Sequence, residues 1–162
     1  MNHKNLQETT VRMHRLVHEL VKKYQFRDRN QICCYDISVS QCYIMYELKP
    51  GGLRMQELAD RMHLDISTMT RVVDQLQKKR YTRRQSDPKD RRIVNVFLTE
   101  KGRAMLEKIE NGIIETDRTI LEKVSPEVRE SILFVLNELL NSVEGWRQAC
   151  CLPPVQGKKA AP

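Results

Sequence analysis

Basic side chains concentrate in one short part of this 162-residue sequence. Between residues 71 and 92, nine basic residues stand at positions 71, 78, 79, 80, 83, 84, 89, 91 and 92, and three acidic residues at 74, 87 and 90. This segment therefore carries nine minus three, or +6, of the formal net charge of +7. Charge this local predicts contact with a polyanion such as nucleic acid or anionic lipid, the alternative being a solvated charged surface.

Five cysteines form the second set of side chains capable of specific chemistry. They occur as two adjacent pairs, Cys33-Cys34 and Cys150-Cys151, and a single residue, Cys42. Because an odd number without a framework spacing is atypical of secreted disulfide-rich domains, we expect reduced thiols. Thiols oxidise reversibly and thiolates select soft ions. The pattern therefore suggests a thiol switch or a soft-metal or metalloid site, with Cys33, Cys34 and Cys42 as candidate ligands.

Cys42 separates two interpretations of these cysteines. It lies close to the predicted start of a helix, where the helix dipole would lower the pKa of its thiol. It also lies on the apolar face of that helix, where a free cysteine is typically a small buried hydrophobic residue. The alternative to a sensor is therefore a set of inert, structural cysteines.

Composition favours a helical protein and disfavours several other classes. Six glycines and six prolines are too few for a turn-dense all-β fold, so we expect mostly helix. No window approaches 18 consecutive apolar residues and the N-terminal residues are polar, so we expect a cytoplasmic protein without a membrane segment or signal peptide. The sequence contains no phosphate-binding loop, no G-x-G-x-x-G and no G-x-S-x-G motif, which argues against an enzyme.

Hydrophobic periodicity places the elements that would position these side chains. Apolar spacings of three and four predict a helix over about Leu6–Phe26, followed by a polar, irregular connection over residues 27–37. Ser38 followed three residues later by Gln41 is a capping box at the start of a second helix. The run KPGG at residues 49–52 ends that helix.

Two short helices then form a helix-turn-helix candidate. The first spans about Met55–Met62 and is interrupted at His63, and Asp65 or Ser67 can cap the second. The second helix has an apolar stripe and an opposite polar face. The stripe is Met69, Val72, Val73 and Leu76, and the polar face is Thr68, Arg71, Gln75 and Lys78.

A β-hairpin and two long helices complete the pattern. β-Branched residues predict a strand over Ile93–Leu98, paired with Tyr81–Gln85 through a turn at residues 86–91. Thr99 can cap a helix over Glu100–Ser125, and a last helix is expected over Val128–Trp146. Residues 153–162 are expected to be a disordered tail.

The block from Glu57 to Gly102 resembles the MarR/SlyA family of prokaryotic winged helix-turn-helix regulators. The resemblance is carried by ELADRMHLDISTMTRVVDQL, by the D-x-R pattern of Asp90 and Arg92, and by VFLTEKG before the long helix. The flanking helices fit the family's dimerisation module. One position departs from the family, because Arg80 stands where glycine often follows the recognition helix, and a left-handed conformation there would cost about 1 kcal/mol.

The resemblance implies a mostly α fold with a small β-hairpin wing and dimerisation helices at both ends. We expect one integrated domain with an N-terminal dimerisation helix and loop (1–37), a winged helix-turn-helix (38–99), C-terminal dimerisation helices (100–152) and a tail (153–162). The implied function is a sequence-specific transcriptional regulator, expected to be a repressor, that binds double-stranded DNA at a pseudo-palindromic site as a homodimer. The alternative to a dimer interface is that the apolar residues of the terminal helices form ordinary core within one subunit.

Groove geometry and the resemblance assign roles to individual residues. A helix can enter the major groove, so the candidates for base and phosphate contacts there are Ser67, Thr68, Thr70, Arg71 and Gln75. The wing can reach the minor groove, where negative potential attracts Arg91 and Arg92. By similarity to the family, Asp90 holds a basic side chain in place. Further phosphate contacts are expected from Arg54, Lys78, Arg84 and Lys89.

The resemblance also implies release or alteration by an effector, whose nature stays open. The candidates are cysteine oxidation, a soft metal or metalloid ion, or a small aromatic ligand bound beside structural cysteines; no other cofactor is expected to be required. A non-regulatory winged-helix module that binds RNA or an acidic protein is the remaining alternative. Salt-dependent, sequence-selective binding to duplex DNA would separate a regulator from such a module.

Overall fold

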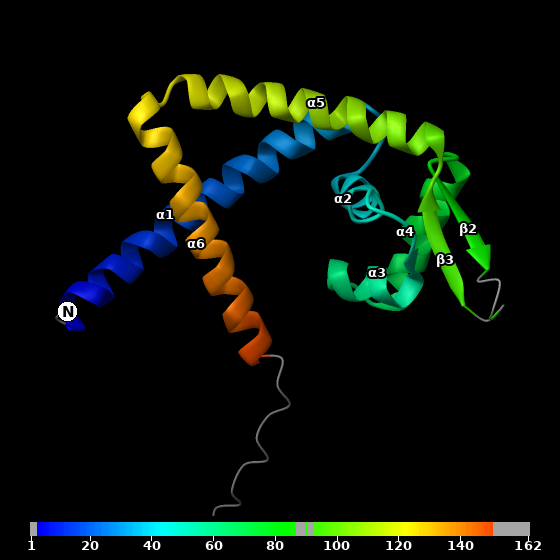
Figure 1. Cartoon of the computed structure of the whole chain (residues 1–162), viewed down its shortest axis with the longest axis horizontal. Helices are drawn as coiled ribbons and strands as arrows, with labels where there is room; N and C mark the ends of the chain where they lie inside the picture. Colours follow the sequence, from blue (N-terminus) through cyan, green and yellow to red (C-terminus); the bar gives the residue numbers. More distant parts are fainter. Residues whose placement is uncertain (1–2, 87–89, 91–92, 151–162) are drawn as a thin grey trace, which may run out of the picture. The chain divides into compact units, whose positions relative to one another are not determined.

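The computed structural model describes residues 3–86, 90 and 93–150 (Figure 1). Within these residues the elements are α1 (His3–Cys33), α2 (Val39–Glu47), β1 (Leu53–Arg54), α3 (Met55–Met62), α4 (Ile66–Lys78), β2 (Thr82–Ser86), β3 (Val94–Leu98), α5 (Glu100–Glu122) and α6 (Pro126–Cys150). A mostly helical architecture with a small antiparallel sheet confirms the predicted fold class. Over the same residues, no helix combines the length and the apolar character that crossing a bilayer requires.

The chain divides into two compact units, Met1–Glu115 and Thr116–Pro162. The first unit holds the elements from α1 to β3 and the first part of α5, and so contains the whole helix-turn-helix and the sheet. The second holds the end of α5 and α6. The boundaries 1–37, 38–99 and 100–152 expected from the sequence stay predictions.

Helix α1 is longer than its hydrophobic pattern predicted. The polar residues 27–37 were expected to be irregular, but the helix continues to Cys33. Tertiary contacts explain the difference, because the carboxylate of Asp28 is buried and accepts a hydrogen bond of 2.7 Å from the Tyr43 hydroxyl of α2. Ile32, one turn further, is fully buried in the core. Burial of a satisfied polar group leaves no apolar period for sequence analysis to detect.

The predicted capping box opens α2. The hydroxyl of Ser38 accepts from the Gln41 backbone N–H at 3.2 Å, and the Gln41 side-chain oxygen accepts from the Ser38 N–H at 3.3 Å. These bonds satisfy two of the donors that a helix start leaves without partners. The cap therefore sets the start of the helix that lies at the centre of the core.

The first helix of the helix-turn-helix, α3, has the bounds that the sequence predicted. His63 closes α3 in the left-handed conformation, with φ of 52°. Asp65 rather than Ser67 caps α4, since its carboxylate accepts from the Thr68 backbone N–H at 2.8 Å. Hydrogen bonds from the hydroxyls of Ser67 and Thr68 hold the pKa of Asp65 well below its usual range. A negative charge is thus retained at the positive end of the α4 dipole.

The three strands form one antiparallel sheet in the order β1-β3-β2. In the β2–β3 hairpin the register pairs Thr82 with Leu98 and Ser86 with Val94, one residue from the predicted strand bounds. The elements predicted from the sequence did not include β1, which pairs Leu53 with Val96. Two residues are too short for a periodic signal, so only pairing reveals this strand.

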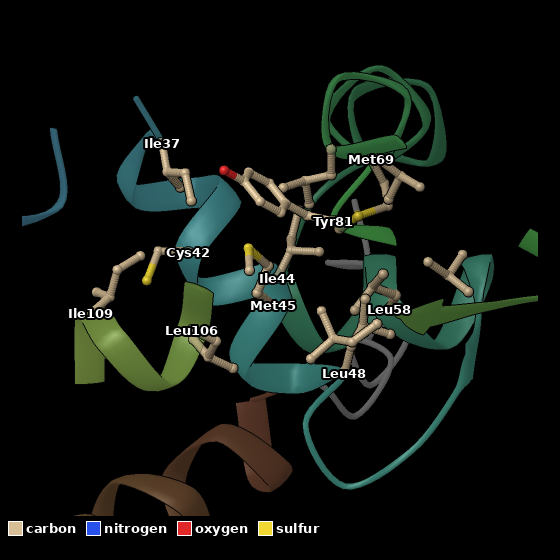
Figure 2. Packing of buried hydrophobic residues seen from close by; sticks show 14 of the residues in the cluster. Ile37, Cys42, Ile44, Met45, Leu48, Leu58, Met69, Tyr81, Leu106 and Ile109 are labelled. Carbon is tan, nitrogen blue, oxygen red and sulfur yellow. The ribbon is translucent and has the colours of Figure 1, made fainter. Parts of the chain in front are cut away.

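An apolar core holds the helix-turn-helix to its neighbours (Figure 2). Ile44 and Met45 of α2, and its C-cap Leu48, are fully buried among side chains from the other elements of the first unit. Those side chains include Leu58 of α3, Met69 of α4, Tyr81, and Leu106 and Ile109 of α5. The orientation of α4 is therefore set by burial of its apolar stripe, which turns its polar face outward.

The end of α4 shows how the Arg80 departure is accommodated. Arg80 adopts φ of 61°, in the left-handed region. Its N–H donates to the Gln77 carbonyl at 2.9 Å and the Tyr81 N–H donates to the Leu76 carbonyl at 3.0 Å, the pattern of a Schellman motif. The Arg80 carbonyl also accepts from the Thr99 hydroxyl at 2.7 Å. Helix α4 thus ends in the conformation that a glycine at position 80 would adopt. The hydrogen bonds offset the strain of the left-handed Arg80 backbone.

Gly102 of the VFLTEKG segment is required for a different reason. A Cβ atom at this position would lie 2.1 Å from the Tyr81 backbone oxygen. That oxygen also accepts from the Thr99 N–H at 3.0 Å, so it cannot move away easily. The first turn of α5 therefore packs directly on the backbone that leaves the recognition helix.

Candidate nucleic-acid interface

Helix α4 separates its apolar and polar side chains as predicted. Met69, Val73 and Leu76 are fully buried, whereas Arg71, Gln75 and Lys78 are exposed. Within the described part of the chain, neither Arg71 nor Lys78 forms an ion pair with a carboxylate. Two cationic side chains on this helix are therefore available to a polyanion.

The hydroxyls at the start of α4 are already used as donors. The Thr68 hydroxyl donates to Asp65 at 2.7 Å, the Ser67 hydroxyl donates to the same carboxylate, and the Thr70 hydroxyl donates to the Ile66 carbonyl at 2.7 Å. Each hydroxyl oxygen keeps lone pairs with which it can accept. In this arrangement the three hydroxyls can accept a hydrogen bond without giving up the one that they already donate.

Gln75 is tied to α2 rather than standing alone on the surface. The side-chain amide of the buried Gln41 donates to the Gln75 side-chain oxygen at 2.8 Å. This bond fixes the orientation of the Gln75 amide through its oxygen. The Gln75 NH₂ group takes no part in the bond. The sequence predicted only a capping role for Gln41. Its hydrogen bond to Gln75 depends on the approach of α2 to α4.

Part of the basic block is neutralised by the protein's own acidic groups. Arg84 pairs with Asp74 at 2.6 Å, and Lys79 pairs with Asp36 at 3.3 Å. The guanidinium of Arg83 lies over the Phe97 ring, 5.0 Å from its centroid. The count of +6 already subtracts Asp74, but it does not include Asp36, so it overstated the charge free to meet a polyanion. Asp36, which is remote in sequence, was outside the counted segment.

Arg54 and the wing belong to the same antiparallel sheet. Arg54 is exposed at the end of β1, and its backbone N–H donates to the Glu57 carboxylate at 3.0 Å. The predicted contacts Lys89, Arg91 and Arg92 lie outside the described residues. Asp90, between them, is exposed, and its backbone carbonyl accepts a hydrogen bond from the Ile93 N–H at 2.9 Å. The roles assigned to the wing stay predictions.

The cysteines fall into two environments. Cys33 and Cys34 are exposed at the end of α1. Cys42 is fully buried in α2, where burial, with smaller contributions from the charges of Asp28 and Glu110, raises the pKa of its thiol to about 12. The expectation that the helix dipole would lower this pKa is wrong, because desolvation outweighs the dipole. The Cys150 side chain and Cys151 lie outside what the structure describes.

The metal hypothesis for these cysteines finds no preformed three-ligand site. Over the described residues, no group of three or more histidine, cysteine, aspartate or glutamate side chains is placed to hold a metal ion. Cys42 is separated from the exposed pair by its burial in the core. Any ion bound at residues 33 and 34 would therefore take two thiols from this part of the chain.

A groove of about 300 Å³ lies beside α5 within the first unit. One wall carries the ammonium of Lys49, which donates to both carboxylate oxygens of Glu110 at 2.6 and 2.7 Å. Apolar side chains face this pair. The lining residues are Lys49, Leu98, Arg103, Leu106, Glu107, Glu110, Asn111 and Ile114. The lining thus combines apolar side chains with charged and polar groups.

The comparisons with known proteins agree with this geometry. A family model described as the MarR family matches residues 37–94. An uncharacterized HTH-type transcriptional regulator of Bacillus subtilis, YhbI, is 36% identical over 117 residues, covering 72% of this chain and 73% of that protein. These matches define the class of protein as a transcriptional regulator with a winged helix-turn-helix fold.

Solved structures reproduce the same fold. A MarR family protein from Bacillus stearothermophilus has a TM-score of 0.81 at 24% identity, over 89% of this chain and 99% of that one. A mutant of S. aureus MepR bound to an oligodeoxyribonucleotide has a TM-score of 0.60 at 21% identity, over 81% of this chain and 97% of that one. The chain belongs to the MarR family and is a transcriptional regulator with a DNA-binding helix-turn-helix, not an enzyme.

Proposed function

We propose that this regulator is a homodimeric repressor that binds a pseudo-palindromic site in double-stranded DNA. The observation that carries the proposal is the exposure of Arg71 and Lys78 on α4, which form no ion pair within the described residues and lie opposite the buried Met69, Val73 and Leu76. A helix turned outward in this way can enter the major groove. The oligonucleotide bound to MepR, which has the same fold, supports the proposal. A protein that acts on chromosomal DNA in a prokaryote would do so in the cytoplasm.

The proposed contacts combine exposed groups with the partly buried Thr68 and Thr70. Ser67, Thr68, Thr70, Arg71 and Gln75 would face the major groove, with Arg71 as the principal charged contact. Arg91 and Arg92 would enter the minor groove and Asp90 would orient a basic neighbour. Phosphate contacts would come from Arg54, Lys78 and Lys89. Arg84 would contribute less, because its guanidinium is paired with Asp74.

The proposed dimer rests on exposed apolar side chains in both units. In α1 the exposed large hydrophobic residues are Leu6, Val11, Met13, Leu16, Val17, Leu20, Val21, Tyr24 and Phe26. In the second unit they are Ile120, Leu121, Val128, Leu133, Phe134, Val135, Leu136, Leu140, Val143 and Trp146. Apolar surface of this extent marks an interaction site. A second copy of the chain is the occupant that a two-fold DNA site requires.

Two kinds of effector remain for the proposed regulator. Cysteine oxidation or capture of a soft metal or metalloid ion would act at the exposed Cys33 and Cys34. A small aromatic ligand would occupy the groove beside α5, and the cysteines would then be structural. Comparing the release of DNA by thiol reagents and by aromatic acids separates the two, provided that the DNA site is known first.

Selection of duplex DNA from a random pool tests the proposed function. The full-length protein is expected to enrich a sequence with two-fold symmetry and half-sites about one helical turn apart. Affinity for that duplex should fall steeply as salt rises and should exceed affinity for a scrambled duplex by about a thousandfold or more. Equal affinity for both duplexes, or preference for RNA, would instead favour the non-regulatory module.

A further inference from the structure

Two thiols at the end of α1 share one hydrogen-bond acceptor. Cys33 is the last residue of α1 and Cys34 follows it, and both side chains are exposed. Each sulfhydryl donates to the carbonyl oxygen of Asn30, at 3.3 Å in both cases. The two sulfur atoms therefore lie on the same side of the helix end. In this position one atom outside the protein can reach both.

We propose that Cys33 and Cys34 together bind a trivalent arsenic compound and that this binding weakens the DNA complex through Asp36 and Lys79. The proposal rests on the proposed function as a DNA-binding regulator, and it narrows the effector to one chemical class. The compound carries one organic or hydroxyl group, because the protein supplies two sulfur ligands and arsenic(III) takes three.

Adjacent cysteines suit a bridging atom better than a disulfide. Successive Cα atoms across a trans peptide lie about 3.8 Å apart, whereas disulfides usually need Cα separations of about 4.4–6.8 Å. A bond between these two sulfurs would strain the backbone where α1 ends. An arsenic atom between them lengthens the bridge and removes that constraint. Thiolates are also the side chains that soft ions select.

Binding is an exchange of ligands at arsenic without a change of oxidation state. Starting from a compound R–As(OH)₂, two As–S bonds form while two S–H and two As–O bonds break. Each thiol proton leaves with one hydroxyl group, so two molecules of water are released. No oxidant or reductant is required. Both thiols give up their hydrogen bond to the Asn30 carbonyl.

The loop after the thiols is anchored to the recognition helix. The Asp36 N–H donates to the Cys33 carbonyl at 3.1 Å, and Asp36 has φ of 55°. Lys79, the C-cap of α4, donates its ammonium N–H to the Asp36 carbonyl and pairs with the Asp36 carboxylate at 3.3 Å. That carboxylate is 96% exposed, so the ion pair alone adds little. The contact depends on the loop backbone presenting its carbonyl.

Arsenic at the thiols would change that backbone. Closing a ring through two adjacent side chains restrains the residues between Asn30 and Asp36, which comprise the end of α1 and the turn that follows it. Ile32 within this stretch and Ile37 directly after it are buried, so the loop cannot shift without disturbing its contact with α4. The position of the recognition helix is thereby linked to occupation of the two thiols.

Intact-mass spectrometry tests the site without DNA, with phenylarsine oxide as the probe. A full-length parent chain carries Cys150→Ser and Cys151→Ser, so that its cysteines are Cys33, Cys34 and Cys42. We expect the parent to retain one phenylarsenic group per chain. Adding Cys33→Ser or Cys34→Ser should abolish the adduct, whereas adding Cys42→Ala, the matched control at the buried thiol, should leave it unchanged.

DNA affinity measured on the same chains tests the coupling. Phenylarsine oxide should weaken binding of the selected duplex by the parent by about tenfold or more, within the usual range of coupling between sites. The Cys33→Ser chain should show no such loss. Lys79→Met should keep the adduct and lose most of the effect on DNA, because it removes the contact to Asp36 and leaves the thiols in place.

Each remaining outcome contradicts a stated part of the proposal. An absent adduct on the parent, or an adduct that survives Cys33→Ser, overturns the site. An adduct that leaves DNA affinity unchanged overturns the coupling. Diamide that releases DNA by forming a bond between Cys33 and Cys34 would replace metalloid binding with oxidation. If the untreated parent selects no duplex, the proposed function fails while the mass measurement still decides the site.

Discussion

The recognition helix and the last helix use apolar side chains in opposite ways. In α4, Met69, Val73 and Leu76 are fully buried by the other elements of the first unit. In α6, none of the side chains that the structure describes is buried, and Leu140 and Trp146 are each 66% exposed. Both helices have apolar residues at helical spacing. Periodicity thus shows that a helix face needs a partner, but not whether the partner belongs to the same chain.

Removing a side chain from the core should have the largest effect. Ile44→Ala leaves a cavity in a fully buried position, so we expect the free energy of unfolding to fall by about 3 kcal/mol. Urea denaturation at a fixed chain concentration measures the change. Ile114→Ala is the matched control, because Ile114 is 57% exposed and should cost less than about 1 kcal/mol. Equal losses would mean that the two positions do not differ in burial.

A charge on the exposed face of α6 should act on association. Leu140→Asp places a carboxylate where the proposed dimer buries apolar surface, so the dimer should weaken by about tenfold or more. Sedimentation equilibrium measures the dissociation constant. Asn141→Asp adds the same charge one residue away and should have a smaller effect. If the wild-type chain is monomeric at micromolar concentration, the exposed apolar face of α6 does not form the proposed dimer.

Removing a basic side chain from the wing should weaken DNA binding at constant fold. Arg92→Ala is expected to reduce affinity for the selected duplex by more than about tenfold at physiological salt, with a shallower salt dependence. Fluorescence anisotropy titrations at several salt concentrations measure both. Arg118→Ala removes the same charge from α5 in the second unit, where Arg118 is paired with Glu122, and should leave affinity unchanged. Unchanged affinity in Arg92→Ala would refute the minor-groove assignment.

The smallest expected effect is a gain in stability at the end of α4. Arg80→Gly relieves a left-handed conformation that the surrounding hydrogen bonds impose, so the free energy of unfolding should rise by about 1 kcal/mol. Gln77→Gly, within the same helix, should lower it by about 1 kcal/mol. Urea denaturation distinguishes the two signs. A loss in Arg80→Gly would show that the arginine side chain stabilises the fold by more than its backbone costs.

Elements with strong local signals were predicted within a residue or two. The capping box of Ser38 and Gln41, the bounds of α3 and the β2–β3 hairpin all depend on residue types close together in the chain. The extension of α1 and the existence of β1 were missed. Each depends on a partner far away in sequence, the Tyr43 hydroxyl for α1 and β3 for β1.

The candidate site divides in the same way. The polar face of α4 follows from its periodicity, and burial of the opposite stripe agrees with it. The partners of the basic groups do not follow, because Asp36, Asp74 and Gln41 approach Lys79, Arg84 and Gln75 only in the folded chain. The reactivity expected of Cys42 failed for the same reason. Its helix position suggested a low pKa, and its burial raises that pKa.

Residue order alone therefore decided the family, the helix-turn-helix, the hairpin and the place of most of the charge. These features depend on hydrophobic period, capping and turn chemistry, which act over a few residues. The tertiary structure decided which charges stay free, which thiols are accessible, and how the left-handed Arg80 is supported. These properties depend on desolvation and on hydrogen bonds between groups that only packing brings together.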